Sequence, residues 1–302
     1  MNLRHIKGNT LAVESNATAV GIYLFTDREC LLIDSGPHPA YARELLQMLE
    51  ARGWEVHAIF NTHGHADHSG GNHCIQENRP CHVYASAIEA AFMENPLLVP
   101  YAMYSAYPPK LLQSTFFMPS ASRVSHTVAE GPLIIKDKRF EVLELGGHTL
   151  GHLGIRTPDD VVFAGDSLLA AAILEAHPCL YLADPGQQLI SLQKLEKENC
   201  SCLYLSHGGL AADAGAVINA NRAVLVHNLD TVQNIIGRER SLEAIIHEFA
   251  ARLGLAMNRN HYFRLAGGIS ALLAYLCNNG RAAITMKNNT PHYRARSFKQ
   301  PG

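Results

Sequence analysis

The chain has 302 residues, of which 47% are hydrophobic and 17% are charged. This composition is that of an ordinary globular protein and excludes collagen-like, coiled-coil and intrinsically disordered chains. The net charge is −2, but residues 1–214 carry 14 basic and 23 acidic side chains, whereas residues 215–302 carry 11 basic and 4 acidic ones. This asymmetry predicts two modules, of which the second is basic.

The sequence shows neither a membrane span nor a secretion signal. No run of about 18 apolar residues occurs, and the opening segment MNLRHIKGNTLAVES lacks the apolar core of a signal peptide. The seven cysteines are scattered and form no CxxC motif, which is typical of reduced thiols in a chain of this length. We therefore expect a cytoplasmic protein without a membrane partner.

The first part of the chain alternates between short apolar runs and helical patterns. The apolar runs at 18–25 and 30–34 predict a β-hairpin. Residues 40–52 place their leucines on one helical stripe and end at Gly53, which predicts a helix with a glycine after its last turn. Two further strands are predicted at 56–60 and 81–85, with a helix of about ten residues before the second. This alternation predicts an α/β layered fold.

Residues 95–122 interrupt the alternation. The segment is apolar and contains five prolines, which exclude a single continuous helix. Its three tyrosines follow one another at a spacing of three, and they are candidate substrate-binding residues: Tyr101, Tyr104 and Tyr107. Such an insertion is typical of a lid over a site, although a packed surface excursion without a ligand fits the pattern equally well.

The alternation then resumes and gives way to a helical tail. Strands are predicted at 132–135, 139–145, 152–156, 161–164 and 202–205, and a helix at 187–199. Three long helices are predicted at 215–236, 239–253 and 261–278, followed by a strand, a turn and a polar end. Three helices before a β-hairpin resemble a winged helix-turn-helix.

The densest cluster of chemically capable side chains follows the predicted strand at 56–60. The sequence there is NTHGHADHSGG, with His63, His65, Asp67 and His68. Imidazole and carboxylate are ligands that Zn²⁺ prefers, and the glycines let the backbone approach closely. His63 and His65 are two residues apart and can face the same way on an extended turn. Asp67 and His68 follow where the chain bends, so their side chains can point toward a second position nearby.

Three other predicted strands each end beside a glycine and a candidate ligand. The segments GGHTLGH, GDS and SHGG supply His148, Asp166 and His207. Ligands at the ends of several strands of one layered sheet converge in space. We therefore expect these three residues to complete the site that the 63–68 turn begins.

Taken in this order, the motifs HxHxDH, GHTxGH, GD and HG resemble the metallo-β-lactamase superfamily over about residues 10–210. The resemblance implies a four-layer αβ/βα sandwich in residues 1–212, with a pair of metal ions at the sheet edge. A helical, basic, winged-helix-like module would then occupy residues 213–302, and residues 95–122 would be an insertion or lid.

By position, the resemblance implies a complete dinuclear ligand set. One metal would be held by His63, His65 and His148, and the other by Asp67, His68 and His207, with Asp166 bridging the two. It also places His152, Thr62, Thr149 and Asp34 beside the ligands, where they orient them. Five other histidines are expected at the surface or in the core: His57, His73, His82, His126 and His177.

The implied chemistry is hydrolysis. Two Zn²⁺ ions, with iron or manganese as alternatives, would bring a bridging water near neutral pKa, so that it is hydroxide at pH 7. Asp67 would ligate a metal and orient this hydroxide, which makes it the candidate catalytic residue. We expect a glyoxalase-II-like hydrolase of a small-molecule thioester or ester, because the insertion is apolar and the basic tail suits an anionic carrier such as glutathione or CoA.

Three other functions remain open from the sequence. An endoribonuclease or phosphodiesterase of the same superfamily would bind nucleic acid through the basic tail, with Arg259, Arg264, Arg281, Lys287, Arg294 and Arg296. An iron-dependent persulfide dioxygenase would use His63, His148 and Asp166. The complete ligand set disfavours a metal-binding sensor. The sequence predicts neither the exact substrate nor the oligomeric state.

Overall fold

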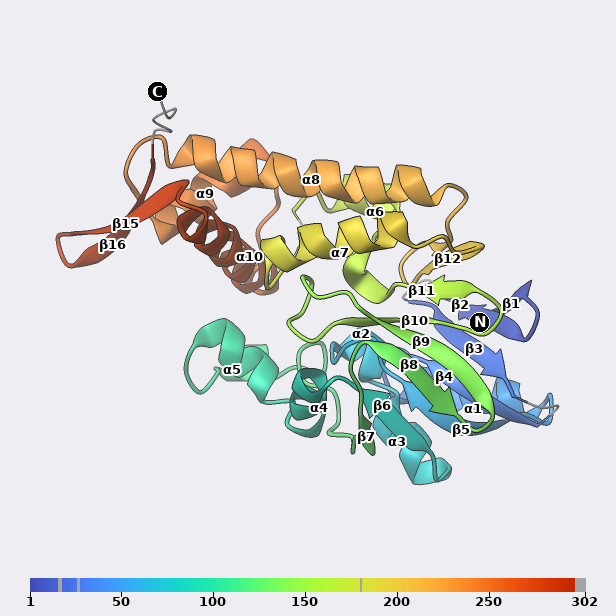
Figure 1. Cartoon of the computed structure of the whole chain (residues 1–302). Helices are drawn as coiled ribbons and strands as arrows, with labels where there is room; N and C mark the ends of the chain where they lie inside the picture. Colours follow the sequence, from blue (N-terminus) through green and yellow to red (C-terminus); the bar gives the residue numbers. More distant parts are fainter. Residues whose placement is uncertain (16–17, 26–27, 180, 297–302) are drawn as a thin grey trace.

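The computed structural model describes residues 1–15, 18–25, 28–179 and 181–296. The polar end of the predicted tail, 297–302, lies outside these residues. Two large sheets pack against each other, and helices cover their outer surfaces (Figure 1). No described helix is both long enough and apolar enough to cross a membrane.

The first sheet has seven strands that follow the order of the sequence. Neighbours from β1 to β4 are antiparallel, and neighbours from β4 to β7 are parallel. The strands are β1 Asn2–Lys7, β2 Thr10–Glu14, β3 Val20–Leu24, β4 Glu29–Ile33, β5 Glu55–Phe60, β6 His82–Ala85 and β7 His126–Thr127. The predicted hairpin at 18–34 is therefore confirmed as β3–β4.

Two helices cover the outer face of this sheet. Helix α1 (Pro39–Glu50) joins the parallel strands β4 and β5, which need a crossover connection, and the side chain of His38 caps its first turn. Leu45 and Leu49 are buried on its inner face, in one core with Ile22 and Leu32 of the sheet. Helix α3 (Asn72–Asn78) packs beside α1 and adds Ile75 to that core.

The second sheet has six strands in the order β13-β12-β11-β10-β9-β8. Only the pair β11–β12 is parallel among its described neighbours. The strands are β8 Gly131–Ile135, β9 Lys138–Glu144, β10 Leu153–Arg156, β11 Val161–Phe163, β12 Cys202–Leu205 and β13 Gly209–Leu210. Helix α7 (Pro185–Lys197) covers its outer face through Leu192 and Leu195.

Aromatic side chains fill the space between the two sheets. Tyr23 and Phe60 of the first sheet share one core with Phe140, Phe163 and Tyr204 of the second. The rings of Tyr23 and Phe140 meet edge to face, with centroids 5.0 Å apart. Helix, sheet, sheet and helix thus form four layers, as the resemblance implied.

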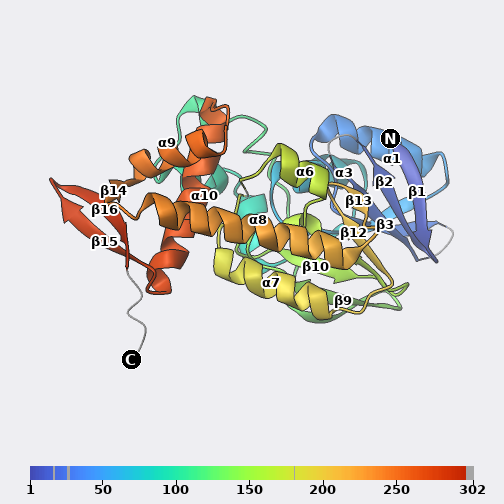
Figure 2. The ribbon, with the colours of Figure 1, turned by 90° about the horizontal axis from the view of Figure 1, so that it is seen from above.

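The C-terminal region adds three long helices and a small sheet. These are α8 Ala214–Ile235, α9 Leu242–Arg252 and α10 Arg259–Asn278, with β14 Arg240–Ser241, β15 Ala282–Lys287 and β16 Thr290–Ala295. Helix α8 belongs to two cores, because Ile218 packs with the second sheet whereas Leu225 and Leu229 pack with α9 and α10. It lies beside α7 and extends to the small sheet (Figure 2).

The predicted C-terminal hairpin is confirmed as β15–β16. Its two turn residues, Asn288 and Asn289, have φ angles of 49° and 60°, as a tight hairpin turn requires. Strand β14 pairs with β16, so α9 begins at Leu242 rather than at 239. The likeness to a winged helix and the boundary at 212 stay predictions.

The sequence missed two strands at the start of the chain. β1 has no apolar face, because most of its side chains are exposed, so periodicity gives no signal there. β2 is a short buried run without polar alternation. The segment 95–122 contains α5 (Leu98–Tyr104) and a short 3₁₀ turn at Lys110–Leu112, in agreement with the prediction that its prolines break any long helix.

Candidate metal centre

The candidate ligands all lie just beyond strand ends. His63 and His65 are in the loop after β5, and Asp67 and His68 are in the short helix α2 (Ala66–Ser69) that this loop enters. His148 lies between β9 and β10. Asp166 is in the 3₁₀ turn Gly165–Ser167 after β11, and His207 follows β12.

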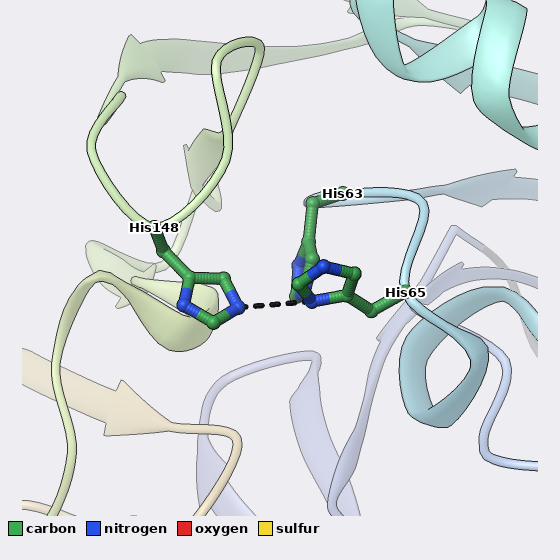
Figure 3. Close-up of side chains that lie close together, drawn as sticks. All are labelled: His63, His65 and His148. Carbon is green, nitrogen blue, oxygen red and sulfur yellow. Dashed lines mark hydrogen bonds between the residues drawn. The ribbon is translucent and has the colours of Figure 1, made fainter. Parts of the chain in front are cut away.

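The fold brings these seven residues into two neighbouring groups. The first is His63, His65 and His148, and the second is Asp67, His68, Asp166 and His207; within each group, one ligand atom per residue lies within 4.8 Å of the others. In the first group, Nδ1 of His65 is 3.1 Å from Nε2 of His63 and 3.0 Å from Nε2 of His148 (Figure 3). These groups match the two sets that the resemblance implied, except that Asp166, which it implied as a bridge, falls in the second group.

Asp166 lies between the two groups. Its Oδ1 is 3.2 Å from Nε2 of His68 and 3.4 Å from Nε2 of His207, both in the second group. Its Oδ2 is 3.5 Å from Nε2 of His148, in the first group. One carboxylate oxygen therefore faces each group, which is the geometry of a bridging ligand.

Buried atoms at this centre match the requirements of a metal ion. Nε2 of His68 and Oδ1 of Asp166 are buried, and although they lie 3.2 Å apart, neither forms a well-aligned hydrogen bond with the other or with any other described residue. Such atoms cost free energy unless a cation or water satisfies them. His148 donates its Nδ1–H to the carbonyl of Tyr181, 3.0 Å away, so its Nε2 presents a lone pair to the centre. The residues present therefore fit a pair of cations.

Electrostatics supports the same conclusion. Burial lowers the pKa of His63, and His68 and His65 lower it further. Burial likewise lowers the pKa of His148 to about 4, against the opposing effect of Asp166. These imidazoles are neutral at pH 7, which is the form that binds a metal.

His68 behaves differently because carboxylates surround it. Burial opposes a charge on its ring, but Asp166, Asp67 and Asp34 together raise its pKa well above the usual value. Nδ1–H of His68 donates to Oδ2 of Asp34 at 2.8 Å. A positive charge is therefore favoured at Nε2, where a divalent cation can take the place of a proton.

Residues around the ligands hold them in place, as the sequence suggested. The buried carboxylate of Asp34 also accepts from the backbone N–H of Thr62, at 2.8 Å. His152 accepts from the backbone N–H of Asp166 at 3.0 Å, and its other ring nitrogen bonds the hydroxyl of Ser167 at 3.1 Å. Gly165 has φ +55°, and a Cβ there would lie 2.6 Å from the His152 ring, so this turn requires glycine.

Glu89 is the orienting residue that the sequence analysis missed. It lies on α4 (Ala87–Glu94), is only 3% exposed, and accepts three hydrogen bonds. Oε1 accepts from the Thr149 hydroxyl at 2.7 Å and the Gly151 N–H at 3.1 Å, and Oε2 accepts from the Gly64 N–H at 2.8 Å. One carboxylate thus joins two ligand loops. In the sequence it looks like an ordinary first-turn acid after the helix cap Ser86, which hides this role.

A cavity of about 600 Å³ opens onto the metal ligands. Its lining includes His65, Asp67, His148, Asp166 and His207. Beyond them the walls are mostly apolar and come from three parts of the chain. The lining residues beyond the ligands include Val99, Met103, Phe116, Phe117, Leu169, Ile173, His177, Cys179, Tyr181, Leu182, Asn221 and Arg264.

The segment 95–122 does form one wall of this cavity, but not through its tyrosines. Tyr101, Tyr104 and Tyr107 are 51%, 43% and 73% exposed and do not line the cavity. Val99 and Met103 of α5 line it instead, since they lie on another face of the same helix. The geometry gives the tyrosines no contact with a ligand in this cavity, and their role in substrate binding stays a prediction.

The five histidines expected elsewhere lie outside the two ligand groups. Three of them, His73, His82 and His126, make contacts at the surface. His73 lies 3.3 Å from Glu77, and His82 and His126 lie 3.3 Å from each other. His57 is partly buried, where burial lowers its pKa. His177 is exposed, as expected, and it also lines the cavity.

Comparisons with known proteins agree with this geometry. Residues 12–207 match the sequence profile of the metallo-beta-lactamase superfamily. A protein of Rhodospirillum rubrum named hydroxyacylglutathione hydrolase is 27% identical over 194 residues, which are 62% of each chain. One of the same name from Shewanella loihica is 26% identical, over 76% of this chain and 85% of the relative. For the first curated relatives, which include the protein of Rhodospirillum rubrum, this chain spans about three fifths of the relative's length.

Solved structures share the fold beyond the four layers. A metallo-beta-lactamase family protein of Thermus thermophilus superposes with a TM-score of 0.75 at 21% identity, covering 95% of this chain and 98% of that one. A beta-lactamase domain protein of Burkholderia ambifaria gives 0.76 at 17% identity, with 98% and 94% covered. Both therefore include the C-terminal helices. The profile match spans well over half of the chain and contains all seven candidate ligands, and the chain belongs to the metallo-β-lactamase superfamily.

Proposed function

We propose that the chain is a dinuclear zinc hydrolase that acts on a thioester or ester of a small organic molecule. The observation that carries the proposal is the position of Asp166, whose two oxygens face the two ligand groups. The names of the curated relatives support a thioester as the bond cleaved. Manganese or iron is the alternative metal.

The reaction adds water to an acyl carbon and releases a thiol or alcohol. Two zinc ions in these groups would lower the pKa of a shared water and polarise the substrate carbonyl. Asp67 lines the cavity, and its Oδ2 is 3.3 Å from Nε2 of His207. A carboxylate in this position accepts a hydrogen bond from the attacking water and holds its lone pair toward the acyl carbon.

The described cysteine that lines the cavity is a poor nucleophile. Cys179 lines the cavity, but burial raises the pKa of its thiol to about 12. A thiol with that pKa is protonated at neutral pH and is a poor nucleophile. Attack by a water at the ligand cluster is therefore favoured over attack by the thiol of Cys179, in agreement with hydrolysis.

The observations favour a small molecule over nucleic acid. Arg281 and Lys287, two of the basic residues that suggested RNA binding, form ion pairs with Asp230 and Glu239. The segment 95–122 presents apolar side chains to the cavity rather than cations. A flexible organic acyl group suits these walls better than a phosphate backbone does.

The cytoplasm remains our proposed location. The buried residues Cys30 and Cys74 carry free thiols, and burial raises the pKa of Cys30 to about 12. Reduced thiols are typical of proteins kept in the cytoplasm.

The test combines metal analysis with a substrate screen on one preparation. We expect about two zinc ions per chain and turnover of at least one thioester in a panel that includes S-lactoylglutathione and acyl-CoA compounds. One iron per chain with oxygen consumption on a persulfide would replace the proposal with the dioxygenase. Cleavage of RNA without turnover of any thioester or ester would replace it with the nuclease.

A further inference from the structure

Past the metal ligands, the cavity is walled by apolar side chains from two directions. Met103, Phe116 and Phe117 come from the segment 95–122. Leu169 and Ile173 come from the other side, the latter on α6 (Ala171–Ala176). A cavity of about 600 Å³ is as large as those that hold drug-sized ligands. A short acyl group would leave most of these walls uncovered.

Arg264 is the only arginine or lysine among the described residues that line this cavity. It lies on α10, which packs against α5, and its guanidinium carbon is 5.9 Å from the ring centroid of Phe116. The structure records no ion pair or hydrogen bond for Arg264 among the described residues. The carboxylates in the described lining, Asp67 and Asp166, belong to the metal-ligand groups.

A guanidinium held beside an aromatic ring is well suited to binding an anion. The contact with the ring fixes the plane of the group and leaves its N–H edges available. Those edges match a carboxylate or phosphate, which they bind through two parallel hydrogen bonds. Arg264 is itself exposed although it lines the cavity, so its contact with an anion would be only partly shielded from water.

We propose that Arg264 binds the anionic group of an otherwise apolar substrate, whose chain or ring fills the space between Phe116 and Ile173. This inference rests on the proposed hydrolase function, because it names the class of thioester or ester that the metal centre receives. The substrate carries one carboxylate or phosphate, separated from the scissile carbonyl by an apolar segment.

This class differs from the substrate in the names of the curated relatives. Those names describe a hydroxyacyl group, which is polar, on glutathione. Glutathione carries two carboxylates and an ammonium group, whereas the described lining offers one arginine, no lysine, and no carboxylate outside the ligand groups. Apolar walls and a single arginine match a molecule with one charge at the end of an apolar body.

Binding is tested first, with thioethers that cannot be hydrolysed. Three probes are compared by calorimetry on the zinc-loaded protein: S-octyl-N-acetylcysteamine, which is neutral, S-(7-carboxyheptyl)-N-acetylcysteamine, with a carboxylate on the acyl side, and 3-(octylthio)propanoate, with a carboxylate on the thiol side. We expect one carboxylated probe to bind at least about tenfold more tightly than the neutral one. Whichever carboxylated probe gains affinity identifies the side of the scissile bond that Arg264 contacts.

The variant Arg264→Gln should remove that preference and leave the affinity for the neutral probe unchanged. Arg259→Gln is the matched control, since Arg259 is an exposed arginine on the same helix that does not line the cavity. A carboxylate bound by the zinc ions instead would keep its advantage in Arg264→Gln, and that result overturns the proposal. Equal affinity of all three probes for the native protein overturns it too.

Hydrolysis is measured separately, on the thioesters that correspond to these probes and on S-lactoylglutathione. If the Arg264-dependent preference is seen but no thioester or ester is cleaved by the zinc-loaded protein, the hydrolase function fails while the anion site stands. If thioesters are cleaved without that preference, the function stands and the anion site fails. The two proposals therefore fail in distinguishable ways.

Discussion

The two ends of the cavity are built in different ways. At the metal end, the candidate ligands are buried or partly buried, and hydrogen bonds accepted by Asp34, Glu89 and His152 fix their loops. At the outer end, the walls are apolar side chains such as Phe116, which is 57% exposed, on segments joined by packing. Hydrogen bonds hold the side chains of the metal end in one arrangement, whereas the side chains of the outer end are positioned mainly by packing against one another.

This difference separates reaction chemistry from substrate choice. A ligand set held by buried hydrogen bonds tolerates few changes, because each lost bond leaves a buried polar group unpaired. Apolar contacts at the outer end are individually weak and tolerate replacement. Substitutions at the two ends should therefore have effects of different size and kind.

The largest effect is expected from Asp166→Ala. Removing the carboxylate that faces both ligand groups should lower the bound zinc from about two per chain to one or none, and kcat/KM by about a thousandfold or more. Metal analysis and kinetics on the same sample check this. Retention of two zinc ions with full activity would show that Asp166 does not bridge.

A smaller loss of kcat and zinc affinity is expected when Glu89 is replaced, because Glu89 belongs to neither ligand group. Glu89→Ala leaves three donors without an acceptor and should reduce kcat and zinc affinity by about ten- to a hundredfold. Glu89→Gln keeps one oxygen acceptor but places an N–H₂ group opposite a hydrogen-bond donor. Its kcat and zinc affinity should therefore lie between those of Glu89→Ala and the native protein.

The control for this pair is Glu94→Gln, an exposed position at the end of the same helix. It should leave zinc affinity and kcat within about twofold of native. Circular dichroism and thermal unfolding separate a local loop effect from loss of the fold. Equal activity of Glu89→Ala and the native protein would contradict the role of Glu89 in joining the two loops.

At the outer end, Phe116→Ala should change substrate preference rather than chemistry. Loss of an apolar wall should raise KM about tenfold for a thioester with a long apolar acyl group and leave acetyl thioesters unchanged. Zinc content should stay at the native value. An equal loss for both substrates would mean that Phe116 supports the fold and not the selection of substrate.

The smallest effect is expected at Tyr107, the most exposed of the three tyrosines. Since its side chain does not line the cavity, Tyr107→Ala should leave kcat/KM within about twofold of native for every substrate tested. A tenfold or larger loss would show that the segment 95–122 moves over the cavity during catalysis and brings this ring to the substrate.

The sequence predicted the metal end far better than the outer end, for a physical reason. Four of the seven ligands lie within His63–His68, and the others follow strand ends beside glycines, so local sequence carries the information. Glu89 could not be recognised, because its function depends on where two distant loops pass it. The same holds for Arg264, which is one of several basic residues in a helical tail until the packing of α10 on α5 places it in the cavity.

The tyrosine prediction shows the limit of spacing as evidence. Residues three apart share a helical face, but spacing alone does not say which face turns inward. In α5 the inner face carries Val99 and Met103, which were not singled out. The layered fold was predictable because the alternation of strands and helices depends on many residues at once.

Helix α10 also completes the cavity from a part of the chain whose described residues belong to neither candidate ligand group. Asn221 of α8 and Arg264 of α10 reach the cavity from beyond residue 207, where the last ligand lies. If the cavity binds the substrate as proposed, mutations in these two helices would change substrate preference while every candidate metal-binding side chain stays the same. Substrate preference could then diverge between related proteins through changes in the C-terminal helices, with the candidate metal centre unchanged.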